Sequence, residues 1–196
     1  MSGPPNAHVG NRHRLTRTMN ISSLLIVGVL MLGSLSSSGT QERIFENTIP
    51  DHIPIKIKSR KEKEASFKDL KNAKWLSEFE VELTNTGDRP IYFLLIHLNT
   101  NVKFDGGPEI VYSVMYGRPE LGDIVTKATS DDVPIKPGET IYLSVGEEPL
   151  WEKAVREKRW PESTKFTALF QQLSFGDGTG YFAGELYPPP ERQKRP

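Results

Sequence analysis

The chain of 196 residues contains no cysteine. This absence excludes disulfide bonds, thiol nucleophiles, iron–sulfur clusters, cysteine-ligated zinc and a lipid carried on an N-terminal cysteine. The chain also lacks the clustered basic face that binding to nucleic acid requires. Basic and acidic side chains both number 25, and residues 1–38 carry three of the arginines and no acid. The remainder is therefore mildly acidic, and we expect no nucleic-acid partner.

Long apolar runs are scarce, and the most prominent is Leu24–Leu35. Its 12 residues fall short of the roughly 20 that a membrane-spanning helix needs. Arginines precede the run, and small residues follow it, which is the order typical of a secretory signal peptide. Ser36 and Ser38 fit the small positions before a cleavage site at Gly39. We expect residues 1–38 to be a signal peptide or, as the alternative, an uncleaved membrane anchor. In both cases the body is exported, to the periplasm or the outside of the cell.

From residue 42 onward, apolar and polar residues alternate with a period of two. IPIKIK (Ile53–Lys58) places three isoleucines on one face, and FEVEL (Phe79–Leu83) places glutamates opposite its apolar residues. A charged outer face indicates an antiparallel sheet with one side in water. Similar patterns predict strands at IVYSVMY (Ile110–Tyr116), IYLSV (Ile141–Val145) and KFTALFQQLSF (Lys165–Phe175).

Other segments carry weaker or different patterns. The continuous apolar run IYFLLIHL (Ile91–Leu98) predicts a central strand buried on both faces. Short strands are expected at Ile124–Lys127, as an edge, and at YFAGEL (Tyr181–Leu186). The charged connection before FEVEL looks too polar for the core, with one helical turn at Ala65–Lys71. Glu147–Glu162 has acids early, bases late and a proline near its end, which predicts one surface helix.

Together these elements predict a mainly β protein, an antiparallel immunoglobulin-like β-sandwich over residues 42–187 with one surface helix. The N-terminal signal or anchor helix precedes it. The proline-rich tail at residues 188–196 is expected to be extended and disordered.

Two phrases resemble signatures of bacterial extracytoplasmic immunoglobulin-like domains. They are VELTNTGDRPIYFLLI (Val81–Ile96) and IKPGETIYLSV (Ile135–Val145). Over most of residues 42–187 the chain resembles a group of uncharacterised exported bacterial proteins. The resemblance implies the same fold and no catalytic residues, because the matching motifs are turns and one fold hosts many functions.

The Gly-rich stretch SFGDGTGYFAGE (Ser174–Glu185) could cradle a ligand or form a hairpin bend. A phosphate cradle needs a helix after the glycines, and a strand pattern follows here. Asp177-Gly178 is the dipeptide that a type I′ hairpin favours, so we expect a bend. A calcium site would need Asp105, Glu109 and Asp177 to converge, and each loop supplies one Asp where calcium needs six to eight oxygens.

No sequence pattern points to catalysis. The chain has no GxSxG and no HExxH motif, and only His52 and His97 follow the signal segment. We therefore expect a non-enzymatic exported protein without a cofactor, which binds a protein or has a structural role in the cell envelope. The alternatives are a carbohydrate-binding or carbohydrate-processing domain and a membrane-tethered accessory subunit. Exposed aromatic rings would stack on sugars or anchor a partner; the candidates are Trp75, Tyr116, Trp151, Trp160 and Tyr187.

Overall fold

The computed structural model describes residues 41–103, 106–145, 153, 157 and 161–189. The signal or anchor segment, nearly all of the predicted helix Glu147–Glu162 and the tail from residue 190 lie outside this part. No helix within it is long and apolar enough to cross a membrane.

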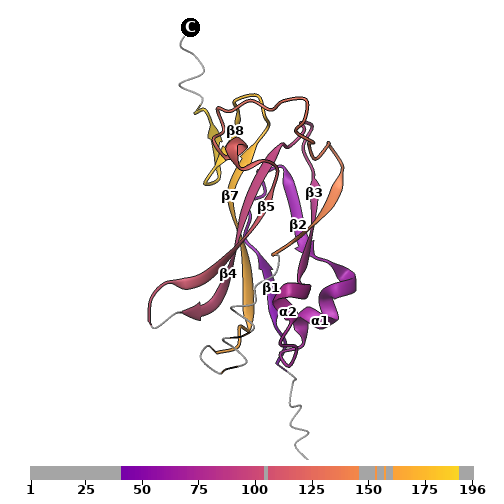
Figure 1. The fold of residues 1–196 in the computed structure, drawn as a ribbon, viewed down its shortest axis with the longest axis vertical. Helices are drawn as coiled ribbons and strands as arrows, with labels where there is room; N and C mark the ends of the chain where they lie inside the picture. The colour runs from indigo at the N-terminus through magenta and orange to yellow at the C-terminus, as the bar shows by residue number, and fades with distance from the viewer. Residues whose placement is uncertain (1–40, 104–105, 146–152, 154–156, 158–160, 190–196) are drawn as a thin grey trace, which may run out of the picture. The chain divides into compact units, whose positions relative to one another are not determined.

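The described residues form a mainly β domain with two sheets (Figure 1). The large sheet has the antiparallel order β5-β4-β7-β8-β9, and β1 pairs in parallel with the start of β7. The small sheet has the antiparallel order β2-β3-β6. The strands of the large sheet are β1 (Ile44–Asn47), β4 (Phe93–Lys103), β5 (Glu109–Tyr116), β7 (Lys165–Ser174), β8 (Gly180–Phe182) and β9 (Glu185–Tyr187). Those of the small sheet are β2 (Ile55–Ser59), β3 (Glu80–Asn85) and β6 (Thr140–Ser144).

The inner faces of the two sheets share one hydrophobic core. The predicted alternation is confirmed in β2 and β3, where the isoleucines, Phe79, Val81 and Leu83 are buried. In β4 the prediction was wrong in part: Leu94, Ile96 and Leu98 enter the core, whereas Leu95 and His97 on the other face are half-exposed. A continuous apolar run therefore forms a strand with one buried face over these residues.

A bulge in β7 keeps its apolar residues pointing inward over its whole length. Leu95 pairs with Gln172 and Ile96 pairs with Phe170, so Gln171 has no partner on β4. The extra residue restores the inward direction for Leu173. The Gln171 carbonyl instead accepts a hydrogen bond from the Ala183 amide, just after β8.

The charged connection between β2 and β3 contributes to the core, contrary to expectation. It contains η1 (Lys61–Lys63), α1 (Glu64–Lys68) and α2 (Trp75–Glu78), so the expected helical turn is present. Phe67 and Trp75 point inward from these turns and contact Phe166 of β7. Phe67 and Trp75 belong to two separate short helices, and the alternation that identifies strands does not predict that both are buried.

A buried arginine joins this end of the domain together. The guanidinium of Arg43, just before β1, lies 4.1 Å from the centre of a Trp75 ring. It donates hydrogen bonds to the carbonyl oxygens of Phe67 and Ser163 and pairs with Glu162 at 2.6 Å. Burial lowers the pKa of Arg43, and the charge of Glu162 acts against that shift. Three distant segments thus meet on one side chain.

The opposite end contains the Gly-rich stretch, which forms a bend as expected. Ser174 pairs with Gly180, and the Phe175 amide donates to the Thr179 carbonyl. The predicted type I′ turn is wrong, because Gly176 and Gly178 have positive φ angles and Asp177 does not. The two-residue turn is replaced by a longer loop.

Asp177 organises this loop with its side chain. It accepts hydrogen bonds from the amide and hydroxyl of Thr179 and pairs with Arg89, which lies 3.9 Å from the Phe175 ring centre. Beyond the loop, YFAGEL contains two short strands, β8 and β9, joined by a turn at Ala183–Gly184. The prediction of a single strand there was wrong.

The connection between β5 and β6 also differs from expectation. No strand forms at Ile124–Lys127, although Lys127 makes one isolated bridge to Asp177. The short helix η2 (Pro119–Gly122) instead places Leu121 and Ile124 in buried positions, and Gly122 lies against the ring of Phe93. This connection covers the end of the outer face of β4.

Candidate binding face on the large sheet

The outer face of the large sheet presents a group of side chains that contains no Asp, Glu, Lys or Arg. Strand register places them in three rows across β5, β4, β7 and β8. We call this set the outer patch, and its members are Met115, Leu95, Gln172 and Phe182 in the first row, Ser113, His97 and Leu169 in the second, and Val111, Asn99 and Thr167 in the third.

Several apolar members of the outer patch are in contact with solvent. The exposed fractions are 43% for Val111, 47% for Met115 and 59% for Phe182, while Leu95 and Leu169 are half-buried. Scattered apolar residues are normal on a protein surface, but neighbouring ones without charges between them mark interaction sites.

Charged residues border the outer patch without entering it. Glu46 of β1 and Lys165 form an ion pair at 2.6 Å beside the third row. Farther along, Lys103 of β4 lies opposite Glu109 of β5 in the strand register. Glu185 follows Phe182 at the β9 edge. An uncharged centre with a charged rim is the composition of protein–protein interfaces.

The outer face of the small sheet has the opposite composition. Lys58 pairs with Glu82 at 3.0 Å across β2 and β3, and Arg60 pairs with Glu80. The Arg60 guanidinium lies 4.4 Å from the ring centre of the exposed Tyr142. Such a face is well solvated and offers a partner less apolar surface to cover.

One polar atom in the outer patch lacks an internal partner. The side-chain oxygen of Asn99 is buried and accepts no hydrogen bond from the described part of the chain. A buried acceptor of this kind costs about 1–3 kcal/mol unless a partner from outside the described residues satisfies it. The outer patch therefore mixes apolar side chains with uncompensated hydrogen-bonding capacity at Asn99.

The calcium candidates do not converge. Asp105 lies outside the described residues. In the strand register, Glu109 lies opposite Lys103 at one end of β4. The loop that contains Asp177 follows Ser174, and Ser174 lies opposite Phe93 at the other end of β4. Ten residues of strand separate these positions, about 33 Å. The described residues contain no group of three or more potential metal-binding side chains.

The aromatic candidates are distributed differently from what we expected. Trp75 is wrong as a binding residue, because it is 0% exposed and packs in the core. Tyr116 is half-buried and donates a hydrogen bond to the Val133 carbonyl, and Tyr187 is half-buried on β9. Trp151 and Trp160 lie outside the described residues.

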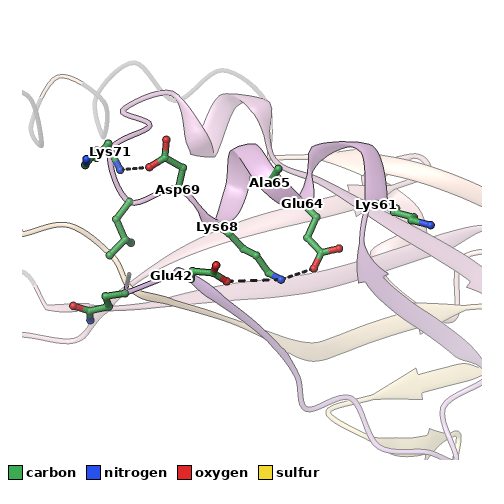
Figure 2. Close-up of a pocket in the computed structure, with 9 residues that line it drawn as sticks. Glu42, Lys61, Glu64, Ala65, Lys68, Asp69 and Lys71 are labelled. Carbon is green, nitrogen blue, oxygen red and sulfur yellow. Dashed lines mark hydrogen bonds and ion pairs between the residues drawn. The ribbon is translucent and has the colours of Figure 1, made fainter. Parts of the chain in front are cut away.

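A cavity of about 820 Å³ beside α1 has an acid–base lining (Figure 2). Lys68 lies between Glu64, at 2.7 Å, and Glu42, at 3.9 Å, while the Asp69 carboxylate accepts from the Lys71 amide. The pair with Lys68 lowers the pKa of Glu64. The lining holds three acids and three lysines, so the cavity offers no concentrated charge of one sign for a ligand.

A smaller cleft of about 510 Å³ contains Arg118 and Asp132. Hydrogen bonds from the Arg118 guanidinium, followed by those from Thr129, hold the pKa of Asp132 well below its ordinary value. A carboxylate with so many donors remains ionised at neutral pH and is a poor general acid. This cluster fixes the loop between β5 and β6.

The histidines take different positions. Nε2 of His52 lies 2.6 Å from the Gly184 carbonyl oxygen, and its ring is close to Tyr181. His97 is central in the outer patch, between Ser113 and Leu169. The sequence reasoning treated His97 as structural and did not find the outer patch.

The outer patch had a signal in the sequence that went unused. FEVEL places glutamates on its outer face, whereas IVYSVMY places Val111, Ser113 and Met115 there, with no charge. An uncharged exposed face on a predicted strand is informative. Only the strand order, however, brings residues from β5, β7 and β8 together.

Comparison with known proteins yields no relative for the chain. No protein-family model matches it, and neither a curated protein nor a solved structure was found to be similar. The functional argument therefore depends on the geometry described above.

Proposed function

We propose that the protein is a non-enzymatic exported protein with an immunoglobulin-like β-sandwich, and that it binds a partner protein through the outer patch. The observation that carries the proposal is the uncharged, partly exposed centre of the large sheet. Export is inferred from the signal-like order of charges and apolar residues before residue 39.

The pairing of the strands supports the immunoglobulin-like assignment. If β2, β3 and β6 are named A, B and E, their order A-B-E is that of one immunoglobulin sheet. Then β5, β4, β7 and β8 correspond to C′, C, F and G of the other sheet. The usual B–F disulfide is excluded because the chain has no cysteine. Aromatic contacts among Phe79, Phe67 and Phe166 occupy the core in its place.

The composition of the outer patch supports a protein partner over a sugar. Sugar binding relies on exposed tryptophan or tyrosine rings with carboxylates near them. The outer patch contains no tryptophan or tyrosine, its rings are those of Phe182 and His97, and Trp75 is in the core. Leucine, valine and methionine side chains instead fit the apolar surface of another protein.

The test is site-specific photo-crosslinking in the cells that produce the protein. A photoreactive phenylalanine derivative replaces Phe182 or Leu169 in the outer patch. The control positions are Tyr142 and Lys56, which are strand residues on the outer face of the small sheet. We expect a discrete adduct with another protein from the first two positions and none from the controls.

Variants test whether the same surface provides the affinity. Phe182→Glu is expected to remove the adduct formed from position 169, while Tyr142→Glu leaves it unchanged. Equal adducts from both sheets, or none from the outer patch, would contradict the proposal. Urea unfolding of each variant shows whether a lost adduct reflects lost folding.

A further inference from the structure

The cleft beside the end of β5 has tyrosine rings in its walls. Its volume is about 510 Å³, and Tyr92, Tyr116 and Val133 contribute to its lining. Tyr92 lies just before β4, Tyr116 ends β5, and Val133 belongs to the connection between β5 and β6. Small-molecule sites are commonly clefts of about 300–1,000 Å³ that combine aromatic rings with a few polar groups. The cleft therefore has the size and the lining of a ligand site.

Contacts within the domain fix the walls of this cleft. The Tyr116 hydroxyl donates a hydrogen bond to the Val133 carbonyl at 2.8 Å. Gly117 has a φ of 87°, and a Cβ there would lie 2.0 Å from the Tyr92 carbonyl oxygen, so only glycine permits this close approach. A Cβ at Gly176 would lie 2.7 Å from Cδ2 of the Tyr92 ring, which shows how closely the ring is held. Walls that are already in place lower the entropic cost of binding a ligand.

Two neighbouring acids in the cleft have different roles. Asp132 accepts two hydrogen bonds from the Arg118 guanidinium, at 3.0 and 3.1 Å, and two more from Thr129. Asp131 is exposed, and within the described residues its carboxylate has one partner, the Ser130 hydroxyl at 3.4 Å. Arg118 is therefore held by Asp132, whereas the oxygen atoms of Asp131 can accept hydrogen bonds from a ligand.

The remaining polar groups indicate which ligands suit the cleft. Tyr92 is half-buried, and its hydroxyl makes no hydrogen bond to the part of the chain that the structure describes. Among the described residues that line the cleft, Arg118 is the one base, and Asp132 neutralises it. An anionic ligand would therefore meet the Asp131 carboxylate without an available positive charge. A ligand with hydroxyl groups and an apolar face suits the lining better.

We propose that this cleft binds a neutral sugar residue of a glycan. The C–H face of the sugar stacks on the tyrosine rings, and the Asp131 carboxylate accepts hydrogen bonds from its hydroxyl groups. Met115 of the outer patch and Tyr116 are consecutive residues of β5 and face opposite sides of the sheet. The inference concerns a different surface and a different class of ligand from the outer patch, so it does not depend on the proposed function.

Saturation-transfer NMR on the full-length protein, in a detergent without a sugar headgroup, tests the proposal. The neutral probes are maltotriose, cellotriose and triacetylchitotriose, and the charged ones are trigalacturonate and deacetylated chitotriose. We expect transfer to the ring protons of a neutral probe and much less to trigalacturonate. Transfer to none of the neutral probes, or equal transfer to trigalacturonate, would overturn the proposal. A larger signal from the cationic chitotriose would indicate an ammonium ligand on the tyrosine rings and would also overturn it.

A pair of conservative variants tests the role of the carboxylate. Asp131→Asn is expected to weaken the affinity for the bound trisaccharide about tenfold, because a neutral amide forms weaker hydrogen bonds than a carboxylate. Asp123→Asn is the matched control, since Asp123 is an exposed acid of the same connection that does not line the cleft. Equal affinities of Asp131→Asn and the wild type would contradict the proposal.

Variants of Tyr92 test the stacking. Tyr92→Leu removes the ring, and we expect the affinity to fall by more than about tenfold. Tyr92→Phe keeps the ring and loses the hydroxyl, so a loss of about threefold is expected. Tyr142→Leu, at an exposed tyrosine on the small sheet, is the control and should bind as the wild type does. Urea unfolding establishes that each variant is folded, and wild-type affinity in a folded Tyr92→Leu variant would overturn the proposal.

Discussion

Arg43 and Arg89 lie at opposite ends of the domain and use the same groups at different depths. Each guanidinium lies about 4 Å from an aromatic ring centre, 4.1 Å for Arg43 and 3.9 Å for Arg89. Each also pairs with a carboxylate, at 2.6 Å and 2.5 Å. The Arg43 side chain is 0% exposed, however, and that of Arg89 is 39% exposed. The two arginines therefore make the same kinds of contact and differ in how far their side chains are buried.

Burial determines what each arginine requires. Water can solvate the exposed donors of Arg89, so losing one partner costs little. The donors of Arg43 have no water, and each needs a protein oxygen; carbonyl groups and Glu162 provide them. We therefore expect the loss of these contacts to destabilise the fold more at Arg43 than at Arg89.

The largest expected effect is that of Arg43→Met, which keeps the length of the side chain but removes its donors. We expect the free energy of unfolding to fall by about 3 kcal/mol, because buried carbonyl oxygens lose their partners. Urea denaturation followed by tryptophan fluorescence measures it. Arg43→Lys is the control, since one ammonium cannot satisfy the same fork of oxygens. A loss below about 1 kcal/mol would contradict the role assigned to burial.

Arg89→Met is expected to have a smaller effect, about 1 kcal/mol, from an exposed ion pair and a ring contact. The same urea measurement applies, and 1 M NaCl should reduce the difference from wild type because salt screens exposed pairs. The corresponding difference for Arg43→Met should hardly change with salt. Equal losses at both ends would remove the distinction.

The smallest effect concerns pH and belongs to the Arg89 end. Hydrogen bonds from Arg118 lower the pKa of Asp132; for Asp177 burial raises the pKa, but hydrogen bonds from Thr179 and the charge of Arg89 lower it overall. A carboxyl with a lowered pKa in the folded state stabilises the fold above its unfolded pKa, about 3.9. That stabilisation is lost as pH falls below about 4 towards the folded pKa.

Asp132→Asn should therefore flatten the fall in unfolding free energy between pH 5 and 2.5. The neighbouring exposed Asp131 provides the matched substitution, Asp131→Asn, which should leave more of that slope. Urea unfolding at several pH values gives the comparison. An unchanged slope in Asp132→Asn would show that other carboxylates control acid stability.

Sequence reasoning was accurate where local pattern and burial agree. The alternating strands β2 and β3 and the strands β5, β6 and β7 were all predicted near their observed bounds. It was wrong at IYFLLIHL and at YFAGEL, because neither the number of buried faces nor a break in a strand follows from apolar content. The loop around Asp177 was wrong in turn type because its conformation depends on Arg89 and Thr179.

The candidate binding face was not predictable in the same way. Its rows join Val111, Leu169 and Phe182, which are separated by many residues and meet through strand order. Trp75 was a candidate binding residue because it lies near the end of a predicted strand, whereas tertiary packing on Phe166 buries it.

The amino-acid sequence alone suffices to predict a mainly β domain, one solvated and one buried side on each alternating strand, and the absence of disulfides. Period-two alternation suffices for this, since neighbouring residues of a strand face opposite sides. The pairing of the strands, the burial of Arg43 and the position of the outer patch become evident in the folded domain. These features depend on contacts between segments up to 120 residues apart, such as Arg43 and Ser163, which local patterns do not encode.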